Sequence, residues 1–159
     1  MNVIKTDIIV IGGGSGGLSV AAGAAQLGAN VVLFEDGEMG GDCLNTGCIP
    51  SKALLAAGKA AHHMAGSAEM GITGINGKVD FAAAKAHVAD VIATIAPHDS
   101  VDRLNGLGVT VIRERASFAG RDKVQSTTHQ VTARYIVIAT GSSPLVPTIA
   151  GLDRTPFHT

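Results

Sequence analysis

At 159 residues the chain has room for about one domain, and its hydrophobic content of 46% is enough to form a core. Aromatic residues make up only 3%, the formal net charge is −1 and no basic cluster is visible, which argues against nucleic acids and anionic membranes as partners. The first residues lack the basic segment and small-residue cleavage site of a signal peptide, so we expect a cytoplasmic protein.

The stretch from Ile8 to Phe34 carries no charged residue and is long enough to imitate a transmembrane helix. Five of the six residues in Gly12–Gly17 are glycine, however, and such a run would unravel a spanning helix. Lipid offers no partner for the backbone groups that would be freed. We therefore interpret the stretch as part of a globular domain and expect no membrane partner.

The predicted elements of the first part are a buried strand at Asp7–Ile11, a tight loop at Gly12–Gly17, a helix over Leu18–Leu27 and a buried strand at Asn30–Phe34. Gly28 ends the helix, and Glu35 lies at the tip of the second strand. A strand, glycine loop, helix and strand within about 30 residues form a βαβ unit, whose crossover is right-handed.

The remaining elements are a loop at Gly37–Gly47, a helix from about Pro50 to Met64, an irregular segment at Gly66–Gly77, a helical stretch from about Phe81 to Gly106, a buried strand at Val109–Ile112, a meander over residues 115–134, a buried strand at Tyr135–Ala139 and a tail at Leu145–Thr159. Pro97 should interrupt the long helical stretch because proline removes a backbone donor. The pattern predicts an α/β fold with a parallel sheet, helices and a small antiparallel β-meander.

The glycine loop Gly12–Gly17 matches the pattern G-x-G-x-x-G. Gly12 permits the tight turn, Gly14 lets the backbone approach a pyrophosphate, and Gly17 lets the helix pack closely on the strand. The helix that follows directs its free N–H groups and the positive end of its dipole toward phosphates. Glu35 stands about 20 residues further on, where an acidic residue binds a ribose. This favours FAD or NAD over NADP; a glycine-rich turn without a ligand is the alternative.

The two cysteines of the chain, Cys43 and Cys48, lie within the run Gly40–Lys52 and are separated by four residues. They can close a small ring if the backbone turns, and Gly47 supplies freedom for that turn. Cys48 falls at the start of a predicted helix, where the helix dipole stabilises a thiolate. Lys52 adds positive charge one turn later. The pattern predicts a reactive, reducible pair.

Other interpretations of the cysteines stay open at this point. A structural disulfide is disfavoured without a secretion signal. A zinc site would combine the two thiols with His62 and His63, but neither the usual cysteine spacing nor the usual histidine spacing is present. Two inert buried thiols are a further alternative. A flavoenzyme without disulfide chemistry or a non-catalytic nucleotide-binding module would share the glycine loop.

Taken together, these motifs resemble the N-terminal part of the class I pyridine nucleotide-disulfide oxidoreductases. That family includes dihydrolipoamide dehydrogenase, glutathione reductase and mercuric reductase. The resemblance is specific over residues 5–55. It returns at Tyr135–Pro144, where Ile138–Ser142 is similar to the second flavin-contacting segment of the family.

The resemblance implies a Rossmann-like FAD-binding domain, with FAD as cofactor and NAD(P)H as co-substrate of the full-length enzyme. It implies cofactor contacts at Gly12, Gly14, Ser15, Gly16, Gly17, Glu35, Gly41, Asp42, Lys52, Ala116, Thr140, Gly141 and Ser142. It also implies that Cys43 is the interchange thiol, that Cys48 is the charge-transfer thiol facing the flavin, and that Lys52 lies near the flavin N5. Asp42 departs from the threonine of well-known members, and its carboxylate would disfavour a thiolate next to it.

The reaction implied by the resemblance is an electron relay. NAD(P)H reduces FAD, the reduced flavin opens the Cys43–Cys48 disulfide, and the dithiol reduces a substrate by exchange; a dihydrolipoamide-type enzyme runs the steps in reverse. The substrate would be a small disulfide, a dithiol or a metal ion, and the full-length protein would be a homodimer.

The resemblance also implies an incomplete domain. We expect residues 1–144 to be the N-terminal segment of the FAD-binding domain and residues 145–159 to begin a linker toward a missing NAD(P)-binding domain, because no second G-x-G-x-x-G occurs. The chain alone should have no NAD(P)H-dependent turnover. Its sheet should lack one strand, which leaves an exposed edge or apolar patch.

Overall fold

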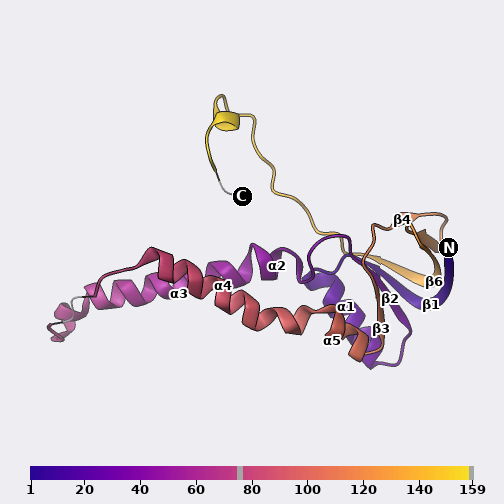
Figure 1. Ribbon diagram of the computed structural model, residues 1–159, viewed down its shortest axis with the longest axis horizontal. Coiled ribbons are helices and arrows are strands. Elements are labelled where there is room, and N and C mark those ends of the chain that lie inside the picture. The colour runs from indigo at the N-terminus through magenta and orange to yellow at the C-terminus, as the bar shows by residue number, and fades with distance from the viewer. Residues whose placement is uncertain (75–76, 158–159) are drawn as a thin grey trace.

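The computed structural model describes residues 1–74 and 77–157 as a sheet-based body from which a helical arm and a C-terminal tail extend (Figure 1). The six strands are β1 (Asn2–Ile11), β2 (Val31–Phe34), β3 (Val109–Ile112), β4 (Ser117–Phe118), β5 (Lys123–Gln125) and β6 (His129–Ile138), in the sheet order β3-β2-β1-β6-β5-β4. The strands β3, β2, β1 and β6 are parallel, whereas β4, β5 and the first part of β6 are antiparallel. The predicted α/β fold with a parallel sheet and a small meander is confirmed.

Strand β6 belongs both to the meander and to the parallel part of the sheet, although the sequence predicts a separate strand for each. Its first residues pair with β5 and close the meander, and the whole strand pairs with β1 in parallel register. The strand predicted at Tyr135–Ala139 therefore begins six residues earlier, at His129. The prediction that it is buried is wrong for Tyr135 and Ile138, which are 55% and 65% exposed, because neither a helix nor a further strand covers them in the described chain.

The helices are α1 (Ser15–Gln26), α2 (Gly41–Asn45), α3 (Cys48–Ala65), α4 (Phe81–Ile95) and α5 (Val101–Gly106), with short 3₁₀ turns at Ser67–Met70, Ala96–Asp99 and Leu152–Arg154. The break expected at Pro97 is present, since the 3₁₀ turn separates α4 from α5. Asp80 caps α4 by accepting hydrogen bonds from the N–H groups of Ala82 and Ala83.

Several boundaries differ from the prediction. Strand β1 begins at Asn2 rather than Asp7, and α3 begins at Cys48 rather than at about Pro50. Helix α1 begins at Ser15 rather than Leu18, because the last residues of the glycine loop already form its first turn, with the N–H of Leu18 donating to Gly14 O. The segment Gly37–Gly47 is not all loop, since α2 lies within it. The side-chain amide of Asn45 stabilises this helix by donating to the carbonyl of Gly41 at 2.9 Å.

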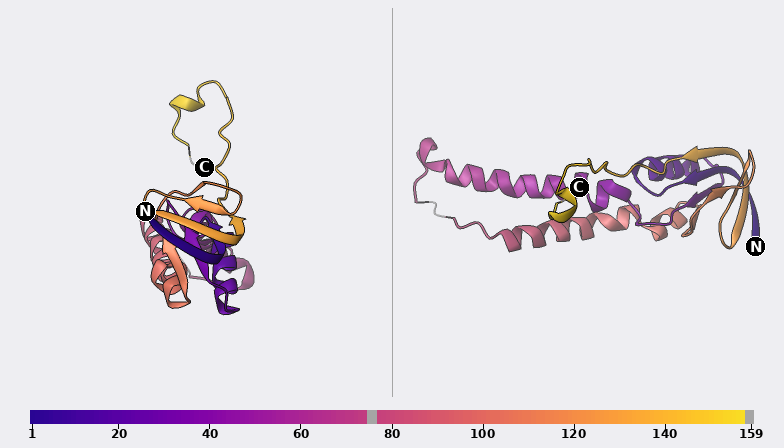
Figure 2. Two further views of the ribbon diagram at one scale, coloured as in Figure 1. Left: turned by 90° about the vertical axis from the view of Figure 1, so that its right-hand side faces the viewer. Right: turned by 90° about the horizontal axis from the view of Figure 1, so that it is seen from above.

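Two hydrophobic clusters lie on opposite faces of the sheet. One joins the parallel strands to the meander through Ile9, Phe34, Ile112 and Val131. The other joins them to α1 and α5, with Leu33 and Leu104 fully buried. The end-on view shows the helices on one side of the sheet and the tail on the other (Figure 2, left).

Helices α3 and α4 form a long antiparallel arm that projects from the body (Figure 2, right). Ala53 is the only buried residue of α3, and α4 has none in the described chain. None of the helices in residues 1–74 and 77–157 is both long and apolar enough to cross a membrane. The tail beyond residue 144 is mostly extended and exposed. Parts of two sequence predictions, at residues 75–76 and 158–159, lie outside the described residues.

Candidate functional site

Two adjoining hollows lie at the carboxyl ends of the parallel strands, and they share Gly12, Glu35 and Thr140. The larger hollow, about 670 Å³, is lined by Gly12, Gly14, Ser15, Gly16, Glu35, Glu38, Gly41, Asp42, Cys43, Asn45, Thr46, Ala139, Thr140, Gly141 and Ser142. The smaller hollow, about 270 Å³, is lined by Ile11, Gly12, Phe34, Glu35, Asp36, Glu114, Arg115, Ala116 and Thr140. Open α/β sheets bind ligands at this edge.

The turn after β1 is built from backbone packed too closely for side chains. Gly12 has a φ of +109°, and a Cβ there would lie 2.2 Å from the carbonyl oxygen of Ala139. A Cβ on Gly17 would lie 1.8 Å from the carbonyl oxygen of Gly12. Gly17 lines neither hollow, and its lack of a side chain lets α1 pack against the strand so that the first turn of the helix faces the larger hollow.

The floor of the larger hollow joins two glycine segments. Gly14 pairs with Gly40 as in a parallel sheet, and Gly40 donates its N–H to the carbonyl of Gly13 at 2.9 Å. Gly41 has a φ of +56°, and a Cβ there would lie 2.8 Å from Cα of Gly14. A side chain is thus excluded at Gly41, where the two segments meet.

The N-terminus of α1 at this floor suits a phosphate group. No side chain caps the helix at Gly14, and its first turn contains no acidic residue. The first N–H groups of a helix have no partner within the helix, so those of Ser15, Gly16 and Gly17 are donors available to an anion. A glycine-lined cradle with such donors fits the pyrophosphate of a dinucleotide.

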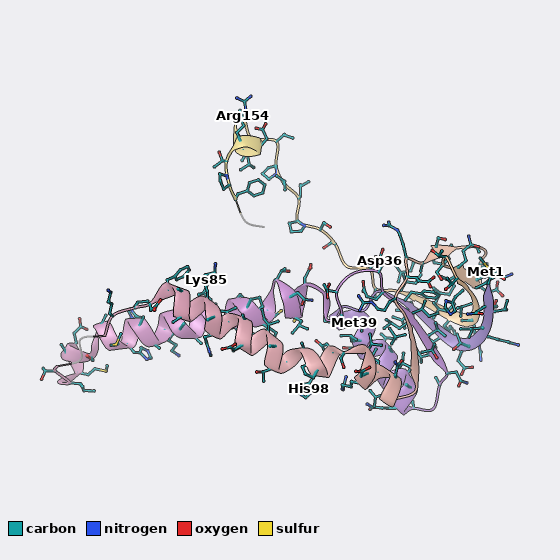
Figure 3. All side chains as sticks on the ribbon, in the orientation of Figure 1. Met1, Asp36, Met39, Lys85, His98 and Arg154 are labelled. Carbon is teal, nitrogen blue, oxygen red and sulfur yellow. The ribbon has the colours of Figure 1, made fainter. Side chains whose placement is uncertain are left out.

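Glu35 stands at the junction of the two hollows. Its carboxylate accepts hydrogen bonds from the backbone N–H groups of Gly13 and Gly37, one on each oxygen. The residue predicted to bind a ribose therefore also holds the glycine loop and the turn after β2. Figure 3 shows Asp36 and Met39 on that same turn, at the end of the body from which the arm extends.

The two thiols come together beside the larger hollow. Cys43 lies in α2 and lines the hollow, while Cys48 is the exposed first residue of α3, and both are free thiols. The neighbouring Cys48 thiol has the largest effect on Cys43 and raises its pKa, and partial burial raises that pKa further. Gly47 allows the approach by its lack of a side chain rather than by a positive φ, since a Cβ there would lie 2.8 Å from the carbonyl oxygen of Asp42.

Two further charges act on Cys43. Lys52 lowers the pKa of its thiol and Asp99 raises it. The sequence predicts that the adjacent Asp42 disfavours the thiolate. In the structure the carboxylate that raises the pKa of Cys43 is instead Asp99, in the turn after α4. Cys48 and Lys52 line neither hollow and lie exposed on α3.

Substitution Lys52→Gln is expected to slow the alkylation of Cys43. Loss of the positive charge removes an influence that lowers the pKa of Cys43, so the thiolate fraction at pH 8 falls and the rate profile moves to higher pH. The measurement is the iodoacetamide reaction rate of the Cys43 peptide by mass spectrometry between pH 6 and 10. Lys59→Gln, on the same helix, is the control. Because Lys52 is exposed, the difference should shrink at about 1 M salt; a salt-independent difference would contradict a Coulombic cause.

The zinc alternative does not agree with the geometry. His62 and His63 occupy the last turn of α3, whereas Cys48 begins that helix. At about 1.5 Å of rise per residue, the histidines lie roughly 20 Å from the thiols. One metal ion cannot bind both groups.

Several lining residues are absent from the sequence prediction. They are Glu38, Asn45, Thr46 and Ala139 in the larger hollow and Ile11, Phe34, Asp36, Glu114 and Arg115 in the smaller one. Asparagine within a glycine-rich loop is a turn signal that could have identified Asn45. No local signal identifies Glu114, whose partners lie across a hairpin.

Among the carboxylates of residues 1–74 and 77–157, Glu114 has the pKa that changes most. The nearby hydroxyl of Ser126, together with hydrogen bonds from the hydroxyl and N–H of Thr128, lowers its pKa from 4.5 to about 2. The ionised form therefore stabilises the fold, and this contribution is present above about pH 4.5 and lost as the pH falls toward 2.

Substitution Glu114→Gln is expected to flatten the decline of stability across this acid range and to lower stability at pH 7. The check is the urea unfolding midpoint at a series of pH values from 7 to 2.5. Glu69→Gln, an exposed carboxylate in the Ser67–Met70 turn, should leave the wild-type profile in place. A profile for Glu114→Gln parallel to that of the wild type would refute the assignment.

Comparison with known proteins agrees with this geometry. Residues 6–159 match the family described as pyridine nucleotide-disulphide oxidoreductase. The chain is 33% identical to a mercuric reductase from Bacillus cereus, covering 96% of this chain and 24% of that protein. It is 39% identical to a dihydrolipoyl dehydrogenase from Bacillus subtilis (strain 168), covering 89% and 31%.

A solved structure, the Cu(II) complex of the HOCl-induced flavoprotein disulfide reductase RclA from Escherichia coli, is similar with a TM-score of 0.73 and 27% identity. The similarity covers 94% of this chain and 31% of that one. The chain thus spans about a quarter to a third of the length of these proteins.

Proposed function

Since the chain belongs to the pyridine nucleotide-disulphide oxidoreductase family, we propose that it forms the FAD-binding part of a flavin-dependent disulfide oxidoreductase. The cofactor of this family is FAD, with NAD(P)H as the co-substrate. The observation that carries the proposal is the pair of free thiols Cys43 and Cys48, close enough for Cys48 to raise the pKa of Cys43, next to a glycine-lined hollow.

The residues of the two hollows fit the cofactor. The free N–H groups at the start of α1 and the Gly14–Gly41 floor would hold the pyrophosphate, and Glu35 would hold the adenosine ribose. Ala116 in the smaller hollow would meet the adenine, and the segment Thr140–Ser142 would contact the cofactor again in the larger one. When bound, FAD supplies a two-electron carrier between a hydride donor and thiols.

The chain's own contribution to the reaction is the thiol pair. Loss of two protons and two electrons joins the two sulfur atoms in a disulfide, and the reverse restores two thiols. In our proposal Cys43 exchanges with the substrate, Cys48 faces the flavin and Lys52 lies near the flavin N5. The relatives named mercuric reductase and dihydrolipoyl dehydrogenase support a metal ion, a disulfide or a dithiol as the substrate class.

We also propose that residues 1–144 are the N-terminal segment of the FAD-binding domain and that the exposed tail begins a connection toward an NAD(P)-binding domain. The complete enzyme would be a homodimer, and turnover with NAD(P)H would require it. The match to only about a quarter to a third of each relative supports this division.

Substitution Gly14→Ala is a test that separates cofactor binding from folding. A Cβ at Gly14 would meet only Cα of Gly41, at an ordinary 3.7 Å, and the backbone there is extended, so the variant should fold normally. If phosphates press against this position, FAD affinity should fall at least about tenfold, or ~1.4 kcal/mol.

The measurement is quenching of flavin fluorescence on titration of the purified chain, with unfolding temperature as the folding control. Gly58→Ala, in an open position on α3, is the matched substitution and should bind FAD as the wild type does. Equal FAD affinity of Gly14→Ala and wild type would count against the proposed cradle. Flavin binding without any redox change of the thiols would instead favour a flavin-binding module lacking disulfide chemistry.

A further inference from the structure

Resting on the proposed function, we propose that Glu114 is a positioning residue for the adenosine end of the site. It ties the chain segment that forms one wall of the smaller hollow to the turn between β5 and β6. No direct contact between its carboxylate and a ligand is required for this role.

The carboxylate of Glu114 is held at both oxygen atoms by one residue of the turn. The N–H of Thr128 donates to one oxygen at 3.0 Å, and the Thr128 hydroxyl donates to the other. Nδ1 of His129 lies 3.6 Å from the carboxylate and 2.7 Å from the Thr128 hydroxyl. Charge-assisted hydrogen bonds at both oxygens restrict the side chain to one orientation.

The turn that holds Glu114 is itself anchored. The N–H of Ser126 donates to the carbonyl of His129 at 2.9 Å, and the N–H of His129 returns a bond to the buried Ser126 hydroxyl. The carbonyl of Thr128 also accepts the N–H of Asn2 at 2.7 Å, at the start of β1. Because these hydrogen bonds hold the turn between β5 and β6 in place, the turn can fix the position of the Glu114 carboxylate that it binds.

The attached segment is part of the proposed binding site. Glu114, Arg115 and Ala116 follow β3 in sequence and line the smaller hollow. Arg113 and Arg115 join this segment to the turn after β2, through a hydrogen bond to the carbonyl of Gly37 and a 3.8 Å ion pair with Asp36. The Arg115 ion pair is exposed and contributes little, so the hydrogen bonds of Glu114 restrain the segment more than this ion pair does.

Thr128 allows the positioning role to be separated from direct ligand contact. It holds the Glu114 carboxylate but lines neither hollow. A substitution at Thr128 can therefore change ligand affinity only by freeing the Glu114 side chain and, with it, the segment that lines the smaller hollow. Substitution Thr128→Val removes the hydroxyl and leaves the N–H donor, whereas Glu114→Ala removes the whole restraint.

The test combines two measurements on the chain of 159 residues. Hydrogen exchange of the ligand-free protein should show faster exchange over residues 114–118 in Glu114→Ala. Calorimetric titration with ADP should show an affinity roughly fivefold lower for Glu114→Ala and about twofold lower for Thr128→Val, the range of effects transmitted through packed networks. Glu114→Gln keeps one acceptor and should fall between wild type and Glu114→Ala. Glu69→Ala is the control and should match wild type.

The outcomes separate this inference from the proposed function. Unchanged hydrogen exchange over residues 114–118 in Glu114→Ala overturns the inference. ADP binding that is weaker in Glu114→Ala but equal to wild type in Thr128→Val also overturns it, because that result would mean direct contact between Glu114 and the ligand. A loss of ADP affinity in both variants, larger in Glu114→Ala than in Thr128→Val and measured at a temperature where all variants are folded, supports the inference. Failure of the wild-type chain to bind ADP overturns the proposed function, and the inference about the ligand with it.

Discussion

Substitution Gly17→Ala is expected to destabilise the chain by at least about 3 kcal/mol and to abolish FAD binding, because the new methyl group has nowhere to go. Its Cβ would lie 1.8 Å from the carbonyl oxygen and 2.9 Å from the carbonyl carbon of Gly12, and both are backbone atoms. To remove this clash, α1 must move away from β1, and the first turn of the helix then moves away from the larger hollow.

The measurements are the unfolding temperature by circular dichroism and FAD titration by fluorescence. A loss of about 3 kcal/mol corresponds to roughly 6 to 12 °C in a chain of this size. Gly23→Ala is the matched control in the same helix, since a Cβ there meets nothing within 4 Å. It should be neutral or stabilising by up to about 1 kcal/mol through helix propensity. A Gly17→Ala variant as stable as Gly23→Ala would mean that α1 does not pack as described.

Removal of either cysteine is expected to eliminate reversible two-electron oxidation of the chain. The wild-type pair, whose two free thiols are close enough to influence each other, should form an intrachain disulfide on treatment with diamide and recover both thiols with dithiothreitol. Cys43→Ser and Cys48→Ser each leave one sulfur, which can form only a disulfide with another molecule. Mass spectrometry before and after alkylation of free thiols distinguishes these products.

The same variants test the roles proposed for the two thiols. With a small aromatic disulfide as probe, Cys48→Ser should trap a mixed disulfide on Cys43, because the resolving sulfur is gone. Cys43→Ser should accumulate less of that product once FAD is bound, if the flavin covers Cys48. Both variants should retain FAD affinity. Intermolecular dimers in place of an intrachain disulfide in the wild type would contradict the proposed redox pair, and equal trapping by both variants would contradict the division of roles.

The part of the site that could be predicted from sequence is the part specified by neighbouring residues. The apolar runs of β1 and β2, the glycine loop and Glu35 lie within one continuous segment, so their order alone places a phosphate-sized cradle before a helix. Cys48 at the start of α3 follows from Pro50 in the same way. The glycine contacts confirm why the residue types matter, as Gly12 and Gly17 leave no room for a Cβ.

Contacts between distant segments account for the features that the sequence did not predict. Helix α2 has only five residues, too short for a periodic signal, and it is stabilised by the contact between its flanking glycines and Gly14. The dual pairing of β6 depends on strands far from it in sequence. Asp99 influences Cys43 only because α4 returns along α3 and brings the two residues near each other.

The amino-acid sequence by itself determined the βαβ unit, the glycine cradle and the identity of the thiol pair, since each depends on short-range spacing and on backbone conformations that few residues allow. Only the tertiary structure decided which charges act on the Cys43 thiol and which carboxylate restrains the wall of the smaller hollow. Electrostatic effects and hydrogen bonds act through space over a few ångströms, and folding alone sets which distant residues come that close.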